Sequence, residues 1–581
     1  MKEGGRAWLL LPMMALVLTA IVYLGVTTDR GVIDYDEGYY SQPALRMAAD
    51  GDWITPHANE VRFLEKPPWL YWVTASSFRI FGVGEFSLRL PTALAVIALT
   101  LIVILTARLT VGPVAAGIAG LSTAFCVGTF LFTRETLHDV WLVLFLAIAM
   151  YAFLRWWLAP SRPLSLALLF YAALAGGVMC KSLIGLVFPV GIAVLFFIWN
   201  REFPTWRSLH IIPGLLLFLA LTVPWHWLAE INNEGFLDFF FVKEQFVRFL
   251  GRREPPVLWS VPLGTFWGLV LVWFFPWIFF VPAAFIGTRR AADEKVRLMV
   301  RLAVVWIVVV LGFFSFSTRL EHYVFPVLPA FSLLVAAAFS RQEYGGPRTG
   351  EDTAFLWGYR SLAAMGLLVM GFGIVAGIWL SMGNVIPSSS TGPTDRLSEN
   401  DFSIMAEMPP EIVQGLLAPA AVTIPVLAIG FIIAFVLGKR QRWKAASLIV
   451  ALVMALVCVM AHWSLIICED LISSKRFGLA IAAEARPGDR LIVVGDYESA
   501  NSLNFYQPLR VEVAEGTAYA LLPGLEYPDA PGIILTSDEF KDVWQSSERV
   551  FVLLPADRRN EMAPDGKEVF RLLHRVLVKN H

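Results

Sequence analysis

Long apolar runs alternate with short polar segments along most of this chain. A helix needs about 20 mostly apolar residues to cross about 30 Å of hydrocarbon, and it satisfies all of its backbone polar groups internally. About thirteen runs of this kind can be identified, near residues 8–26, 88–110, 112–132, 140–158, 164–180, 183–199, 208–229, 261–287, 301–317, 323–340, 357–382, 416–438 and 443–467. The pattern predicts an α-helical polytopic membrane protein.

Composition supports this prediction and excludes some functions. Of the 581 residues 57% are hydrophobic and the mean hydropathy is +0.64, too apolar a chain for one soluble core. The net charge is −1 and the sequence shows no clustered basic face, so nucleic acid is excluded as a partner. The four cysteines show neither zinc spacing nor a disulfide framework.

The basic residues predict the orientation of the chain. The first apolar run follows Lys2 and Arg6 and is interpreted as an uncleaved signal anchor. With a cytoplasmic N-terminus, lysine and arginine fall in alternate short loops on the cytoplasmic side. An odd number of crossings then places residues 27–87 and 468–581 on the same extracytoplasmic face. We expect a transmembrane domain at 1–467 and a second domain at 468–581.

The C-terminal segment 468–581, called the tail below, is expected to be a small α/β domain. Helical spacing is found at 475–485, 499–506, 537–545 and 565–573, and strand-like runs at 490–495, 509–513, 533–536 and 549–555. It contains no glycine-rich phosphate fingerprint, so no nucleotide cofactor is expected. Between membrane segments, 230–260 is predicted to hold an interfacial helix and 383–414 a mobile loop.

The first extracytoplasmic loop, 27–87, carries an unusual cluster of charges. It contains Asp34-Tyr35-Asp36-Glu37, then Gly51-Asp52-Trp53, then Phe63-Leu64-Glu65-Lys66-Pro67-Pro68. Charges gathered beside hydrocarbon indicate a functional site, and the alternative is a solvated loop. Two helices are expected, at 36–49 and 68–81. Glu65 and Lys66 would then precede a helix N-terminus, a place suited to anions.

Taken in order, these motifs resemble a known family. The further members of the set are Arg89-Leu90-Pro91, Asp139, Lys181, a Glu244-x-Phe-x-Arg-Phe box and His322-Tyr323-x-Phe-Pro. Together they resemble the ArnT-type bacterial lipid A aminoarabinose transferases and related lipid-carrier glycosyltransferases, kin to the protein O-mannosyltransferases. The resemblance covers most of the chain.

The resemblance implies a GT-C fold and a glycosyltransferase that takes a sugar from undecaprenyl phosphate at the periplasmic face of the bacterial inner membrane. The implied acceptor is lipid A or a related envelope molecule. An alternative acceptor is a protein or another envelope glycan. A transporter or flippase is a further alternative, but charges at one edge and the lack of a repeat argue against it. A monomer is expected.

The resemblance also assigns site residues. Lys66, Lys181 and Tyr323 would contact the donor phosphate, whose departing charge must be held by cations. Without the resemblance, the favoured interpretation of Lys181 is a snorkelling anchor, and Tyr323 is equally an aromatic-belt residue. Asp36 matches the catalytic aspartate and Asp139 a second acid, for which a helix cap is the alternative. Glu37, Glu244 and His322 are possible supporting residues.

Two departures from the family pattern leave questions open. Gln245 stands where the family often has histidine, which would bind a divalent metal ion together with Glu65. The metal prediction therefore stays open; His138, His226 and His322 could substitute, although a lone histidine is more often a hydrogen-bonded structural residue. Tyr39 stands where the transferases tend to have arginine.

Overall fold

The computed structural model describes residues 10–247, 260–288, 293–344, 350–381 and 408–581. Within these ranges nine segments are long and apolar enough to cross a membrane. They are α4 (Glu85–Arg108), α7 (Asp139–Leu158), α8 (Leu164–Lys181), α10 (Ile211–Asn232), α13 (Glu294–Ser315), η4 with α14 (Glu321–Val327 and Leu328–Tyr344), α15 (Gly350–Ser381), α17 (Pro410–Lys439) and α18 (Trp443–Ile467).

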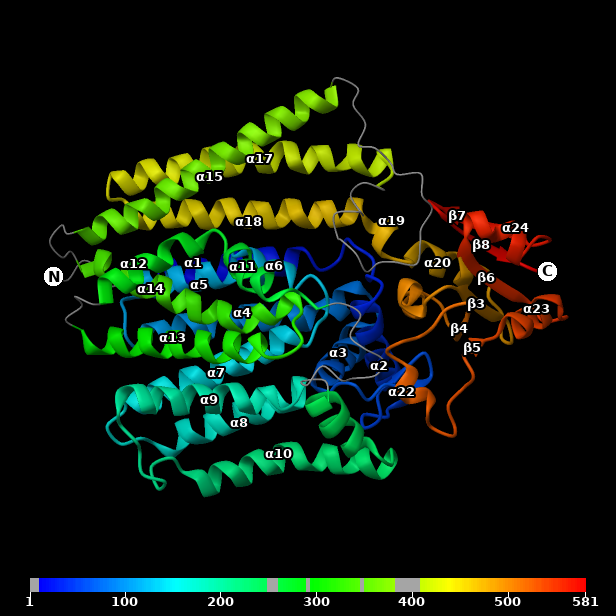
Figure 1. Cartoon of the computed structure of the whole chain (residues 1–581), viewed down its shortest axis with the longest axis horizontal. Helices are drawn as coiled ribbons and strands as arrows, with labels where there is room; N and C mark the ends of the chain where they lie inside the picture. Colours follow the sequence, from blue (N-terminus) through cyan, green and yellow to red (C-terminus); the bar gives the residue numbers. More distant parts are fainter. Residues whose placement is uncertain (1–9, 248–259, 289–292, 345–349, 382–407) are drawn as a thin grey trace.

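Shorter and bent apolar helices occupy the remaining predicted positions. A bent pair is formed by α11 (Leu263–Trp273) and the segment Trp277–Phe285, which covers η3 (Trp277–Phe280) and the start of α12 (Val281–Thr288). Three short helices are α1 (Leu10–Gly25), α5 (Pro113–Ala124) and α9 (Ile184–Asn200). The chain is a multi-pass membrane protein, as the apolar runs predicted, and its long helices run side by side in Figure 1.

The first loop folds as two helices against one end of this bundle. Helix α2 (Asp36–Asp50) ends at Gly51, whose φ of 83° is accessible to glycine at little cost, and α3 (Trp69–Phe81) starts directly after Pro68. A two-stranded hairpin, β1 (His57–Ala58) with β2 (Val61–Arg62), joins them. In Figure 1 the two helices lie between the bundle and the tail.

The tail holds a six-stranded sheet in the order β5-β4-β3-β6-β8-β7. Its strands are β3 (Arg490–Val494), β4 (Val511–Ala514), β5 (Ile534–Leu535), β6 (Val550–Pro555), β7 (Lys567–Leu572) and β8 (Arg575–Lys579). The pairs β3/β4, β3/β6 and β4/β5 are parallel, whereas β6/β8 and β7/β8 are antiparallel.

The two faces of the sheet pack against different partners. Alternate residues such as Leu491 and Val493 share a core with Tyr39, Phe63 and Tyr71 of the first loop. The residues between them, such as Ile492, pack with Phe540 of α23 (Ser537–Gln545). The period of two along each strand therefore buries one face against the first loop. Whether 468–581 is a domain of its own stays a prediction.

Two predictions about the loops and the tail need correction. Residues 565–573, expected to be helical, form β7 instead, and the next residues form β8, joined to it at Leu573 with a φ of 54°. The expected loop at 383–414 overlaps α17, which begins at Pro410; residues 382–407 lie outside the described residues. The predicted interfacial helix is a π-helix, η2 (Asp238–Val247), as far as it is described, and 248–259 lie outside.

We predict that the close approach of α8 and α9 tolerates no side chain at Gly185. A Cβ there would lie 2.2 Å from the backbone carbonyl carbon of Gly177, so the two helices would have to move apart to accommodate it. Gly185→Ala should cost about 1 to 3 kcal/mol, measured as a fall in the thermal unfolding temperature of the detergent-solubilised protein. Gly312→Ala on α13, where a Cβ meets nothing within 4 Å, is the matched control and should not lower it.

Candidate active site

A cavity of about 220 Å³ opens where the first loop meets the bundle. Loop one contributes Asp36, Tyr40, Glu65 and Lys66; the ends of α7 and α8 contribute His138, Asp139, Lys181 and Ser182; η2 contributes Glu244 and Gln245; and η4 contributes His322 and Tyr323. The site residues predicted from the sequence line this cavity, except Glu37 and the substitute metal ligand His226.

Asp36 is the first residue of α2 and is only partly buried. Its carboxylate makes no hydrogen bond to any part of the chain that the structure describes. Burial, and then the nearby carboxylate of Glu65, raise the pKa of Asp36 to about 6, although Lys66 opposes the shift. A carboxylate with a raised pKa and an unused hydrogen-bonding capacity is suited to accept a proton.

Each of the two lysines is held by a carboxylate. The Lys66 Nζ lies 2.7 Å from Glu65 Oε1, and Lys181 forms an ion pair and hydrogen bond with Asp139. The Lys181 ammonium also lies 5.1 Å from the centre of the Tyr323 ring. His322 Nε2 approaches the other oxygen of Asp139 at 3.9 Å. Both cations are therefore fixed at the cavity wall, where an anion could share them.

Helix α8 ends where it does because the backbone turns sharply after Lys181. Ser182 has a φ of 103° and its hydroxyl donates to Gln245 Oε1 at 2.7 Å. Gln245, where the resemblance led us to expect histidine, thus ties η2 to the end of α8. Among the described residues no three histidine, cysteine or acidic side chains are grouped so that they could hold a metal ion. The metal prediction stays a prediction, and no step of the proposed mechanism passes through a metal.

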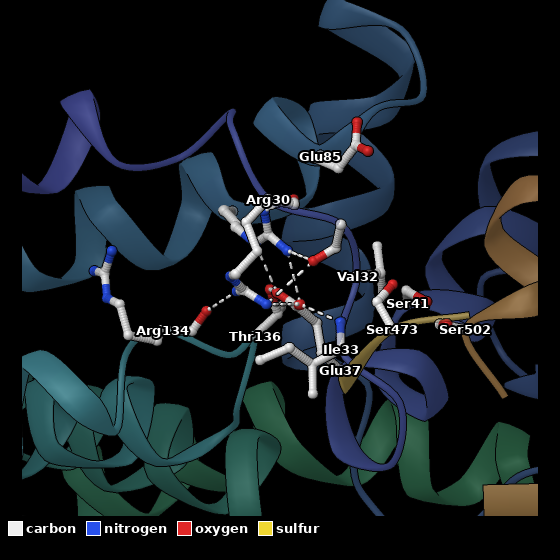
Figure 2. Close-up of polar contacts among 12 residues, drawn as sticks. Arg30, Val32, Ile33, Glu37, Ser41, Glu85, Arg134, Thr136, Ser473 and Ser502 are labelled. Atoms are coloured by element: carbon white, nitrogen blue, oxygen red, sulfur yellow. Dashed lines mark hydrogen bonds and ion pairs between the residues drawn. The ribbon is translucent and has the colours of Figure 1, made fainter. Parts of the chain in front are cut away.

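Glu37 lies outside the cavity in a buried charge cluster (Figure 2). The Arg89 guanidinium donates to both Glu37 oxygens, at 2.9 and 2.8 Å, and Arg30 approaches at 3.4 Å. The backbone N–H of Ile33 donates to the same carboxylate at 3.0 Å. These partners hold the pKa of Glu37 at about 2, in spite of burial. Glu37 anchors the start of α2 and so fixes its neighbour Asp36.

The tail holds the residue that precedes Asp36. Tyr35 has a φ of 71° and a ψ of −119°, a conformation rarely adopted by a residue with a side chain. Asn501 donates to the Tyr35 carbonyl at 2.8 Å and accepts from its N–H at 2.9 Å. Asp34 accepts from the Ser502 N–H and the Ser474 hydroxyl, both at 2.9 Å. Strain of this kind persists only where the surroundings over-determine it.

Sequence reasoning missed these tail residues. Asn501 and Ser502 lie far from Asp36 along the chain and belong to no motif, so nothing in their local pattern marks them. His226 has the structural role that is commoner for a lone histidine, since its Nδ1 lies 2.8 Å from the Thr222 carbonyl oxygen. Tyr40 carries a weak signal, since it follows Asp36 by one helical turn and therefore shares its face.

We predict that Glu37→Gln destabilises the protein. The two guanidinia of Arg30 and Arg89 would remain buried without a compensating negative charge, at a cost of about 3 to 5 kcal/mol in unfolding free energy. Thermal unfolding of the solubilised variant measures this loss. Asp50→Asn on the same helix removes the exposed ion pair with Arg46 and should change stability by less than about 1 kcal/mol. Equal stabilities of the two variants would contradict the anchoring role.

Comparisons with known proteins agree with this geometry. The family model described as dolichyl-phosphate-mannose-protein mannosyltransferase matches residues 65–227. An undecaprenyl phosphate-alpha-4-amino-4-deoxy-L-arabinose arabinosyl transferase from Pseudomonas aeruginosa is 28% identical over 64% of this chain and 64% of its own length. An uncharacterised protein from Aquifex aeolicus is 29% identical over 52% of this chain and 66% of its own length. The chain thus spans just under two thirds of these relatives.

The fold matches over nearly the whole chain. The crystal structure of ArnT from Cupriavidus metallidurans bound to undecaprenyl phosphate superposes with a TM-score of 0.82 at 22% identity, covering 99% of this chain and 98% of that one. Its apo crystal structure gives a TM-score of 0.81. The resemblance predicted from the motifs is confirmed: the chain is related in sequence to the ArnT-type aminoarabinose transferases and has their GT-C fold.

Proposed function

We propose that this protein is an inverting glycosyltransferase that moves a sugar from undecaprenyl phosphate to lipid A or a related envelope acceptor. The observation that carries the proposal is the shared cavity: Asp36 faces the same space as Lys66 and Lys181. The transfer of a sugar from a lipid phosphate needs a carboxylate that can take a proton and cations that stabilise the departing phosphate. The names of the relatives support undecaprenyl phosphate as the lipid carrier of the donor sugar.

The proposed reaction is a single displacement. With a hydroxyl acceptor, Asp36 takes the hydroxyl proton while the acceptor oxygen forms a bond to the anomeric carbon of the sugar. The bond from that carbon to the phosphate oxygen breaks, and the electron pair leaves with the lipid phosphate. Lys66, Lys181 and Tyr323 stabilise the charge that develops there. With a phosphate acceptor the nucleophile is already ionised, and Asp36 would orient the sugar instead.

The placement of the tail supports a site at the periplasmic face of the bacterial inner membrane. The first loop and the sheet share one core, so both lie on the same side of the bundle. The positions of the basic loops favour an orientation in which that side faces away from the cytoplasm. A protein acceptor is a second candidate, and the mannosyltransferase model that matches residues 65–227 favours it. Product analysis by mass spectrometry of envelope lipids and glycoproteins would decide between the two.

We predict that Lys66→Ala weakens binding of undecaprenyl phosphate about 10- to 100-fold, because it removes a charge-assisted contact to the phosphate. Binding to the solubilised protein measures the affinity. Lys439→Ala, an exposed lysine at the far end of α17, should leave it unchanged. An unaltered affinity in Lys66→Ala would remove this residue from the phosphate site.

We predict that transfer to a hydroxyl acceptor depends on the ionised form of Asp36. Since the pKa of Asp36 is about 6, kcat/KM should rise about tenfold per pH unit below pH 6 and level off above it. Asp36→Asn should abolish turnover, because an amide takes no proton, while affinity for undecaprenyl phosphate is kept. Asp50→Asn should retain both activity and pH profile. Turnover by Asp36→Asn at the wild-type rate would refute the proposed mechanism.

A further inference from the structure

His138 is a buried histidine without a hydrogen-bond partner. It immediately precedes α7, its exposure is only 2%, and neither ring nitrogen has a partner in the part of the chain that the structure describes. Its ring packs edge-on against Tyr40, at 4.7 Å between ring centres, and against Tyr71, at 5.4 Å. Buried polar groups are usually paired, because an unpaired one has lost its hydrogen bonds to water without replacing them. The structural role expected for a lone histidine does not account for it.

The position of His138 supplies the second observation. His138 lines the cavity together with Asp36, Lys66 and Lys181. His462 on α18 shows that a missing partner alone does not define a site: both of its nitrogens are equally unpaired, but it does not line the cavity. In the described structure His138 combines an unpaired imidazole with a place on the cavity wall.

The chemistry of the wall indicates which part of a ligand His138 would meet. Burial, followed by the charges of Lys66 and Lys181, holds the pKa of His138 well below its ordinary value, so the ring is neutral. A neutral imidazole carries one donor and one acceptor. An ionised phosphate only accepts hydrogen bonds and is matched by the two lysines, whereas a hydroxyl both donates and accepts.

We propose that His138 contacts the sugar of the donor through a hydroxyl group, and that this contact discriminates between sugar-bearing and bare lipid phosphates. The assignment rests on the proposed function, since it takes the ligand to be a polyprenyl phosphate sugar. It divides the cavity wall into a cationic part for the phosphate, at Lys66 and Lys181, and a neutral part for the sugar, at His138. A sugar without a hydroxyl in reach of the ring would leave the imidazole unpaired and bind more weakly.

The test compares two affinities in the full-length solubilised protein. Bare undecaprenyl phosphate and undecaprenyl phosphate bearing glucose, mannose or a pentose are the probes, and the ratio of their dissociation constants reports the sugar contact. His138→Phe keeps a ring between Tyr40 and Tyr71 but removes both nitrogens. For at least one sugar, the preference of the wild-type protein for the sugar-bearing lipid should fall about tenfold, while affinity for the bare lipid is unchanged.

Two further variants separate a sugar contact from a structural effect. His138→Gln supplies one donor and one acceptor again and should restore part of the lost preference. His462→Phe removes the other unpaired imidazole and should leave the preference unchanged. A ratio that is the same in His138→Phe and wild type for every sugar, or a wild-type protein that does not distinguish the lipids, overturns the assignment. Failure of the wild-type protein to bind bare undecaprenyl phosphate overturns the proposed function, and this assignment with it.

Discussion

The geometry of the site depends on one buried carboxylate and the two guanidinia around it. Glu37 accepts two hydrogen bonds from Arg89 of α4 and lies beside Arg30, whose Nη2 donates to the Arg134 carbonyl at 2.7 Å. Three segments that are distant in the sequence thereby meet at the start of α2 (Figure 2). Since buried charges are tolerated only in well-matched arrangements, this cluster permits little choice in where the first loop sits.

The acidic residues of the cavity differ in whether they form an ion pair with a lysine. Glu65 and Asp139 each hold a lysine, so both cations are oriented before any ligand arrives. Asp36 has no such partner among the described residues and keeps its capacity for a proton. Preorganised charges of this kind stabilise a developing negative charge without reorganising at the moment of reaction. Five of the charged groups that line the cavity thus form two ion pairs and one carboxylate without a described partner.

The convergence of Asp36, Lys66 and Lys181 on one cavity could be predicted. Their charges lie at one face of a membrane bundle, and their motifs follow the order of the family that the chain resembles. Glu37 was harder to place. Adjacent helical residues point about 100° apart, so the neighbour of a cavity residue faces elsewhere. The β7–β8 hairpin escaped prediction because Leu573 adopts a positive φ without the glycine or asparagine that marks such turns. Asn501 carries no local pattern, since its role exists only in three dimensions.

The clamp of Asn501 on Tyr35 has a consequence for the biogenesis of the protein. A nascent chain whose apolar helices have all inserted still lacks the side chain that secures the backbone just before Asp36. The backbone before Asp36 is therefore secured only after the stretch around Asn501 has been translated and folded onto the first loop. Because the tail is the last part of the chain to be synthesised, the position of Asp36 is the last feature of the cavity to be fixed.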